Sequence, residues 1–140
     1  RKALMEWLMW TGILLGTLLP IGFLIGFIRW NPELELKFLI NTILDYFIFV
    51  AIIEELVFRG FIYNLLRRTW GDLTSSILTT VLFATIFSHI ASGHFPNWPY
   101  VGMALLAGTV YTASYHRTKN ILVPILLHGT VDSVWRIFFS

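Results

Sequence analysis

Two neighbouring glutamates stand in an otherwise apolar stretch of the chain, AIIEELVFRGF, residues 51–61. Glu55 and Arg59 are four residues apart with the acid first, which is the favourable order for an ion pair on one face of a helix. Glu54 lies about 100° around that helix from Glu55, so Glu54 cannot share the arginine on equal terms. We therefore expect Glu55 and Arg59 to form a structural pair and Glu54 to be left for chemistry.

Imidazole and carboxylate groups recur later in the chain, again in apolar surroundings. His128 and Asp132 are four residues apart, so a helix places both on one face. His89 stands near the end of a separate apolar segment. A single histidine in such a place is often a packing residue, but two histidines combined with Glu54 favour a functional site.

The composition indicates that this site lies in a membrane protein. The chain is 56% hydrophobic and 13% charged with a mean hydropathy of +0.73, whereas soluble domains are about 45–50% apolar and about 25% charged. On insertion scales, a charged side chain at the centre of a membrane helix costs about 2.5 to 3.5 kcal/mol. Charged residues at such positions usually serve function, which favours a site in the interior of a helix bundle.

Several other chemistries are disfavoured. A net charge of +2 with scattered basic residues argues against a nucleic-acid partner, and the absence of cysteine excludes disulfides, thiolate metal sites and a cysteine nucleophile. No cofactor is expected, and no H-E-x-x-H motif occurs. The two glutamates and two histidines could ligate a divalent metal, but their spacing does not imply one. Ser88 and Ser133 lie beside histidines, but no nucleophile elbow is present.

Five apolar segments approach the length of about 20 residues that a membrane-spanning helix needs. These segments cover about 5–28, 36–66, 72–91, 99–115 and 120–138. The second is too long to lie straight across the bilayer and must tilt or extend beyond it. We predict an all-α, polytopic membrane bundle of about five transmembrane helices, a single integral-membrane domain over residues 1–140 with its site in the bundle interior.

The basic residues of the short connections predict the orientation, because cytoplasmic loops carry an excess of Lys and Arg. Five spans put the N-terminus, the 67–71 loop and the 116–119 loop on one side. That side holds six basic residues, Arg1, Lys2, Arg67, Arg68, Arg117 and Lys119, against three on the other, Arg29, Lys37 and Arg136. The N-terminus is therefore predicted to be cytoplasmic. His94 and His116 fall in loops and are expected to face solvent or the interface.

The polar residues also form a recognisable pattern. The stretch EELVFR resembles the EExxxR signature of the CPBP family, the CAAX-processing and bacteriocin-processing intramembrane proteases also called Abi proteins. HGTVD, residues 128–132, resembles the family's H-x-x-x-N/D motif in its aspartate form. His89 lies where the family has F-x-x-x-H, but Thr85 stands at the phenylalanine position. The family-like motif core covers about 36–138.

The resemblance implies an intramembrane endopeptidase that hydrolyses a peptide bond in a membrane-embedded or lipidated, CAAX-like substrate. The catalytic residues that it implies are Glu54, His89, His128 and Asp132, supported by Glu55 and Arg59. Glu54 with His89 would activate a water molecule, and His128 with Asp132 would flank the developing oxyanion. Because an ionised carboxylate repels an oxyanion, Asp132 must either be protonated or orient His128.

The expected partners are membrane lipid and a peptide or prenylated-peptide substrate, with other membrane protein subunits left open. Two other classes of function also remain open. One is a non-catalytic family member that acts as a membrane scaffold, binding or immunity protein, and the other is a metal-binding or transport bundle. Glu54→Gln separates the first from an enzyme, because it abolishes turnover in an enzyme but changes stability or partner association in a scaffold.

Overall fold

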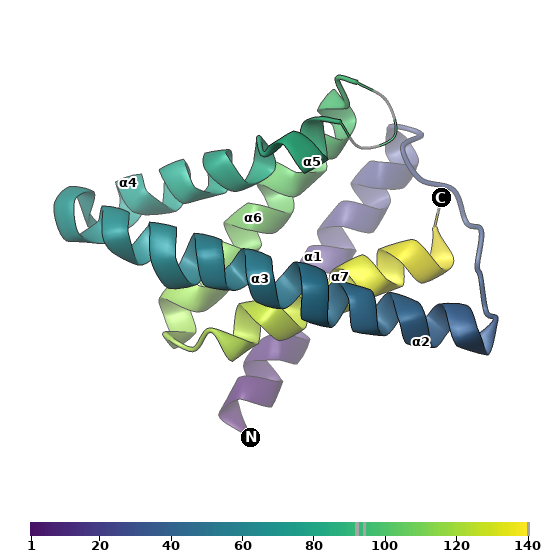
Figure 1. The fold of residues 1–140 in the computed structure, drawn as a ribbon, viewed down its shortest axis with the longest axis horizontal. Coiled ribbons are helices and arrows are strands. Elements are labelled where there is room, and N and C mark those ends of the chain that lie inside the picture. The colour runs from purple at the N-terminus through teal and green to yellow at the C-terminus, as the bar shows by residue number, and fades with distance from the viewer. Residues whose placement is uncertain (92, 94, 140) are drawn as a thin grey trace.

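A computed structural model describes residues 1–140 except residues 92, 94 and 140, and except the side chains of residues 87 and 88. His94 therefore lies outside the described residues. The elements in chain order are α1 (Lys2–Leu24), α2 (Leu36–Leu44), η1 (Asp45–Ala51), α3 (Ile52–Glu55), η2 (Leu56–Tyr63), α4 (Asn64–Ala84), α5 (Phe87–Ile90), α6 (Trp98–Thr118) and α7 (Leu122–Phe138) (Figure 1). The described chain contains no strand beyond one isolated bridge between Trp30 and Phe139. The all-α prediction is confirmed.

The helix that carries the two glutamates changes its winding on both sides of them. Two π-helical stretches, η1 and η2, flank the single α-turn of α3, which holds Glu54 and Glu55. The π-helix, with its i→i+5 hydrogen bonds, is rare and occurs frequently at functional sites. The side chain of Asn64 completes the hydrogen bonding after η2, since its Nδ2 donates to the carbonyl oxygens of Arg59 at 2.9 Å and Gly60 at 3.0 Å.

The prediction of a loop at residues 67–71 is wrong, because the helix continues through these residues. The chain reverses at Gly71 inside α4, where φ is 73° and ψ is 177°. Glycine adopts this positive φ readily because it has no Cβ. Two helical arms therefore meet at a sharp bend without a loop, and Figure 1 shows the second arm returning alongside the first. This return brings Phe83 back to the level of the glutamates.

The predicted third helix, 72–91, is interrupted before it reaches His89. Helix α4 ends at Ala84, the cap residue Thr85 has a φ of −101° and a ψ of 9°, and the short α5 follows. The Thr85 hydroxyl donates to the carbonyl of Val81 at 2.7 Å, a local bond that competes with regular helix propagation. His89 is thus carried by a separate turn and not by the end of a long helix.

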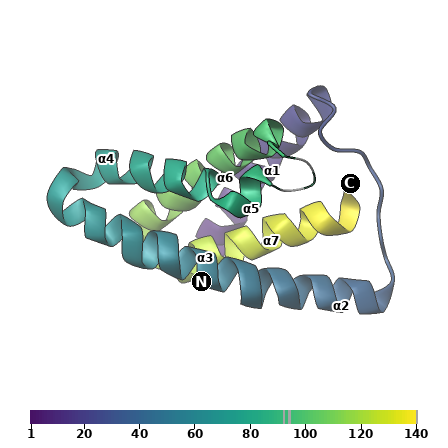
Figure 2. The ribbon, with the colours of Figure 1, turned by 45° about the horizontal axis from the view of Figure 1, so that its top comes forward.

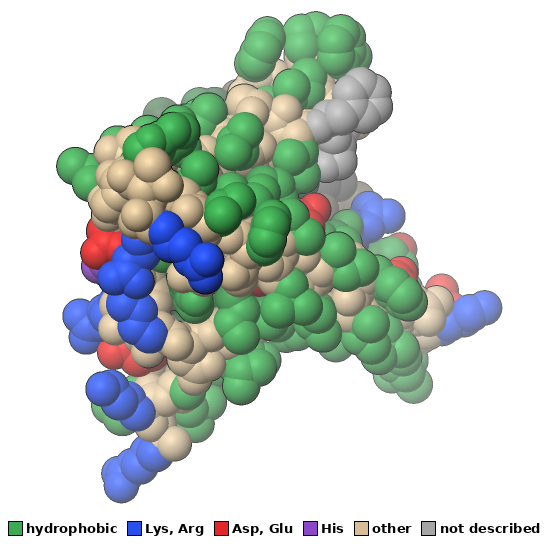
Figure 3. Space-filling model, turned by 60° about the vertical axis from the view of Figure 1, so that its left-hand side comes forward, with side chains coloured by type: hydrophobic (Ala, Val, Ile, Leu, Met, Phe, Trp, Pro, Cys, Tyr) green, Lys and Arg blue, Asp and Glu red, His purple; other side chains and the backbone are tan. Residues whose placement is uncertain are grey.

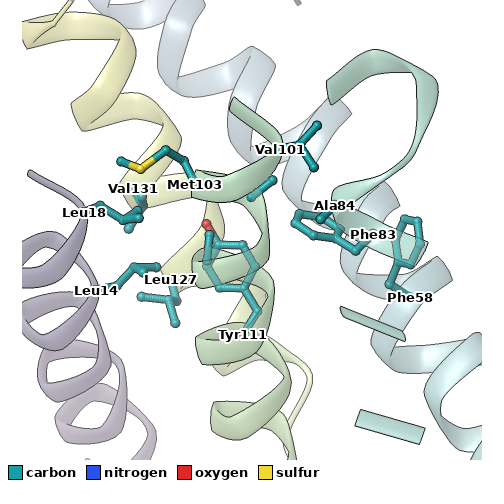
Figure 4. Close-up of a cluster of buried hydrophobic side chains, with 12 residues drawn as sticks. Leu14, Leu18, Phe58, Phe83, Ala84, Val101, Met103, Tyr111, Leu127 and Val131 are labelled. Atoms are coloured by element: carbon teal, nitrogen blue, oxygen red, sulfur yellow. The ribbon is translucent and has the colours of Figure 1, made fainter. Parts of the chain in front are cut away.

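Helix α6 forms the centre of the packing, with contacts to α1, α4, α5 and α7 (Figures 1 and 2). It begins after Asn97, whose side-chain oxygen accepts a hydrogen bond from the backbone N–H of Tyr100 at 3.1 Å, as helix N-caps do. Gly108 permits the close approach to α4, because a Cβ at this position would lie 2.8 Å from Cδ1 of Phe83. Figure 4 shows the buried apolar cluster that these contacts enclose.

Two helical segments are long and apolar enough to cross a membrane, α1 over Lys2–Leu24 and the bent helix over Leu36–Ala84. Large apolar side chains remain exposed on their outer faces, including Leu24, Phe49 and Leu73. The view in Figure 3 shows extensive hydrophobic surface, with most Lys and Arg side chains gathered at one end of the molecule. The exposed basic side chains of the predicted cytoplasmic side are Arg1, Lys2, Arg67, Arg68, Arg117 and Lys119.

Candidate active site

The Glu55–Arg59 ion pair expected from the sequence is present and fully buried. Nη1 of Arg59 donates to Oε1 of Glu55 at 2.9 Å, and both side chains have 0% exposure. The arginine also reaches α6, where Nη2 donates to the carbonyl oxygen of Gly108 at 3.0 Å and Nε to the hydroxyl of Thr112 at 3.4 Å. Arg59 therefore joins the glutamate helix to α6.

Aromatic rings enclose the guanidinium of Arg59. Its Cζ lies 4.5 Å from the ring centre of Phe83 and 5.3 Å from that of Tyr111. Such cation–π contacts are worth about 2 kcal/mol when the cation is removed from water. They stabilise a buried charge that the carboxylate alone would only partly compensate.

His128 occupies the centre of the site, with carboxylates on both sides of its ring. Its Nδ1 donates to Oε1 of Glu55 at 2.8 Å, and its Nε2 lies 3.2 Å from Oδ2 of Asp132, one helical turn further along α7. An ionised carboxylate oxygen only accepts, so a hydrogen bond at either nitrogen needs a proton on the ring. His128 is therefore positioned by a carboxylate at each of its two ring nitrogens.

Glu54 differs from Glu55 in its environment. Its Oε2 lies 3.9 Å from Nε2 of His128, and its side chain is 21% exposed. This oxygen is buried but has no hydrogen-bond partner among the residues that the structure describes. Among the described residues Arg59 forms an ion pair with Glu55 and none with Glu54. This is the difference between the two glutamates that their helical positions predicted.

His89 is held by the break that interrupts the predicted third helix. Its Nδ1 lies 2.8 Å from the carbonyl oxygen of Phe83, and its ring packs edge-on against the ring of Phe83 with centres 4.9 Å apart. Since a carbonyl oxygen only accepts, Nδ1 carries the proton and Nε2 is the free nitrogen of the neutral ring. No hydrogen bond or ion pair joins Glu54 to His89 in the described chain; the histidine nearest Glu54 is His128.

Phe83 provides an aromatic contact that the sequence motif places elsewhere. Thr85, the residue at the motif's phenylalanine position, is exposed and bonded to its own helix. Phe83 instead contacts the rings of His89 and His128 and the guanidinium of Arg59. The interruption between α4 and α5 makes these contacts possible, because it turns His89 back toward Phe83.

A partly open cavity of about 80 Å³ adjoins these groups. The polar residues that line it are Tyr46, His89, Tyr100, Tyr111, His128 and Asp132. The structure thus brings together three of the four predicted catalytic residues at one cavity, whereas the fourth, Glu54, does not line it and lies 3.9 Å from His128. Sequence reasoning missed the tyrosines, since nothing in the spacing of Tyr46, Tyr100 and Tyr111 indicates that they meet.

The imidazole of His128 and the carboxylates around it contact one another. No group of three or more His, Asp or Glu side chains that could hold one occurs among the described residues. His128 presents neither ring nitrogen freely, because Glu55 and Asp132 contact both. The arrangement suits acid–base chemistry, since it combines a carboxylate oxygen and an imidazole nitrogen that have no hydrogen-bond partner among the described residues with a cavity beside them.

Comparison with known proteins identifies the family. The model of the type II CAAX prenyl endopeptidase Rce1-like family matches residues 36–134. The chain belongs to this family. The match includes all six residues singled out above, and it confirms the resemblance drawn from the EELVFR and HGTVD motifs.

A protein from Escherichia coli described as an uncharacterized 24.3 kDa protein is similar to the chain, with 27% identity over 101 residues. The matched region covers 71% of this chain and 44% of that relative, so the chain spans less than half the length of the relative. No solved structure is significantly similar to the chain.

Proposed function

We propose that this protein is an intramembrane endopeptidase that hydrolyses a peptide bond in a membrane-embedded or prenylated, CAAX-like substrate. The observation that carries the proposal is the cavity at which His89, His128 and Asp132 meet, with Oε2 of Glu54 3.9 Å from His128. Membership of a family of prenyl endopeptidases supports the reaction type. Cavity, free carboxylate and family point to the same chemistry.

In the proposed reaction Glu54 is the general base. Its carboxylate accepts a proton from a water molecule that Nε2 of His89 helps to orient, and the water oxygen attacks the peptide carbonyl carbon. The carbonyl oxygen becomes an oxyanion, which collapses as the C–N bond breaks. Glu54 then returns its proton to the departing amine, leaving a carboxylic acid and an amine as products.

The surrounding residues support this chemistry by fixing His128. Glu55 bonds to Arg59 and His128 at once, and Asp132 contacts the opposite nitrogen of the ring. Of the two roles expected for Asp132, the 3.2 Å contact supports orientation of His128. A protonated His128 would place a positive charge beside the oxyanion, where it stabilises the transition state.

We also propose that the chain crosses the membrane five times with its N-terminus in the cytoplasm. The exposed apolar side chains of α1 and of the Leu36–Ala84 helix support contact with lipid tails. The six basic residues at one end, against three at the other, support the orientation. Accessibility of single cysteines introduced at Arg68 and at Arg29 to a membrane-impermeant reagent tests it, and labelling from the same side would contradict it.

The test of the activity uses the chain reconstituted in liposomes with a fluorogenic farnesylated CAAX peptide. We expect cleavage by the unmodified chain and a loss of more than about 10²-fold in kcat/KM for both Glu54→Gln and His89→Ala. Glu33→Gln, an exposed glutamate before α2, is the matched control and should leave the rate unchanged. Equal turnover by the unmodified chain and both site variants would contradict the proposed mechanism.

A further inference from the structure

Tyr111 lines the cavity beside His128. The residue as a whole is 1% exposed, and its hydroxyl forms no hydrogen bond within the part of the chain that the structure describes. Tyr111 lines the cavity together with Met103 and Val131, and Figure 4 shows its hydroxyl end directed toward the side where Val131 lies. A phenol hydroxyl that lines a cavity and has no protein partner is available to donate a hydrogen bond to a group bound there.

The ring of Tyr111 is fixed in place from both faces of the site. It stacks on the imidazole of His128 with ring centres 4.6 Å apart and an interplanar angle of 21°. The guanidinium of Arg59 lies 5.3 Å from its centre, and the ring of Phe83 lies 6.0 Å away. The hydroxyl is therefore held rigidly in a position set by the same groups that fix His128.

In the proposed reaction His128 stabilises the oxyanion through its charge, and a further hydrogen-bond donor at the same cavity would add to this stabilisation. Both ring nitrogens of His128 already contact carboxylates, since Nδ1 donates to Glu55 and Nε2 lies 3.2 Å from Oδ2 of Asp132. An ionised carboxylate at position 132 has no proton to offer an oxyanion. A phenol donates one O–H and carries no charge that would repel the oxyanion.

We propose that Tyr111 is a further catalytic residue, whose hydroxyl donates a hydrogen bond to the oxyanion formed at the substrate carbonyl. This inference rests on the proposed endopeptidase function. The hydroxyl keeps its proton throughout, so no bond is formed or broken at Tyr111. Tyr46 and Tyr100 line the same cavity, but both are only partly buried, and neither stacks on His128.

Tyr111→Phe tests the assignment, because it removes the hydroxyl and retains the ring that stacks on His128. We expect kcat on the farnesylated peptide to fall by about 10²-fold with KM unchanged, as for loss of one oxyanion donor. Tyr115→Phe is the matched control on the same helix, since its hydroxyl accepts from Asn64 at 2.9 Å and does not line the cavity. It should leave kcat unchanged.

A second measurement distinguishes catalysis from packing. A peptidyl aldehyde, whose hydrate resembles the tetrahedral intermediate, should bind Tyr111→Phe more weakly by the same factor as the loss in kcat. If Tyr111 had only a structural role, Tyr111→Phe would change the unfolding temperature. It would then weaken the binding of the aldehyde and of the uncleaved peptide by the same factor.

Three outcomes would overturn the inference, and they are distinguishable. An unchanged kcat in Tyr111→Phe overturns the role of Tyr111 and leaves the proposed function standing. A fall of kcat in Tyr100→Phe and not in Tyr111→Phe does the same, and would assign the donor to Tyr100. Failure of the unmodified chain to cleave the peptide or bind the aldehyde overturns both the inference and the proposed function.

Discussion

Two clusters in this molecule are built from the same four side-chain types, an acid, an arginine, a histidine and a tyrosine. The buried cluster consists of Glu55, Arg59, His128 and Tyr111. The peripheral cluster, where the α4 bend meets the end of α6, consists of Asp72, Arg67, His116 and Tyr63. The ion pair of the first has 0% exposure on both sides, whereas Arg67 and Asp72 are 42% and 44% exposed.

The tyrosines show what separates the two clusters. The hydroxyl of Tyr63 contacts Nδ1 of His116 at 2.8 Å and donates to Asp72 at 3.3 Å, so its hydrogen-bonding capacity is used. Tyr111 lines the cavity, and its hydroxyl forms no hydrogen bond within the described chain. Residue types are therefore the same in both clusters, and the difference is that the hydroxyl of Tyr111 is still available to a ligand in the cavity.

Arg59→Met should produce the largest effect on stability, because it leaves the Glu55 carboxylate buried without its cation. Breaking a buried pair from one side costs about 3–5 kcal/mol. We expect the variant to unfold at a much lower temperature in detergent, or to fail to fold. Arg67→Met is its counterpart in the peripheral cluster and should unfold at nearly the original temperature. Equal losses in both variants would show that burial does not distinguish the clusters.

His128→Gln and His116→Gln compare the two histidines. The first removes the group that joins Glu55 to Asp132, so we expect a loss of more than about 10²-fold in kcat/KM. It should also destabilise the fold by about 1–3 kcal/mol, since Glu55 loses a buried partner. The second should keep the peptidase rate. Thermal unfolding and peptide cleavage measured on the same preparations check both, and loss of activity in His116→Gln would contradict the comparison.

The two tyrosine variants should give opposite results. Tyr63→Phe removes a hydroxyl that is already hydrogen-bonded, so we expect about 1 kcal/mol of destabilisation with turnover unchanged. Tyr111→Phe removes one without a partner, so we expect unchanged stability with reduced kcat. For each variant we compare the change in the free energy of unfolding with the change in kcat. If these two changes stood in the same ratio in both variants, the assignment of separate roles would be contradicted.

The smallest difference between the two clusters should be their response to salt concentration. At about 1 M ionic strength the screening length falls to about 3 Å, which weakens exposed ion pairs and leaves buried ones almost unaffected. The small shift in unfolding temperature caused by Asp72→Asn should therefore disappear at high salt. The deficit of Arg59→Met should persist. A deficit of Arg59→Met that salt abolishes would place the Glu55–Arg59 pair in contact with solvent.

The sequence predicted those parts of the site that depend on local geometry. Helical spacing is enough to pair Glu55 with Arg59, to separate Glu54 from both, and to place His128 and Asp132 on one face. Motif order identified the family. Three of the five predicted apolar segments, the first, the fourth and the fifth, correspond closely to α1, α6 and α7, although α6 starts at Trp98 and α7 at Leu122.

The remainder depends on packing that no local pattern encodes. The break after Ala84 lies in a stretch of apolar and β-branched residues that reads as continuous helix, and only the Thr85 hydroxyl gives a weak signal there. The contact between Glu55 and His128 joins residues on separate helices, as does that between Tyr111 and His128. The bend at Gly71 replaces an expected loop because one positive φ reverses the chain.

The cavity beside His89, His128 and Asp132 is only partly enclosed. A water molecule or a peptide segment can therefore approach these groups without a helix first moving aside. The arrangement needs no opening step before the reacting groups meet.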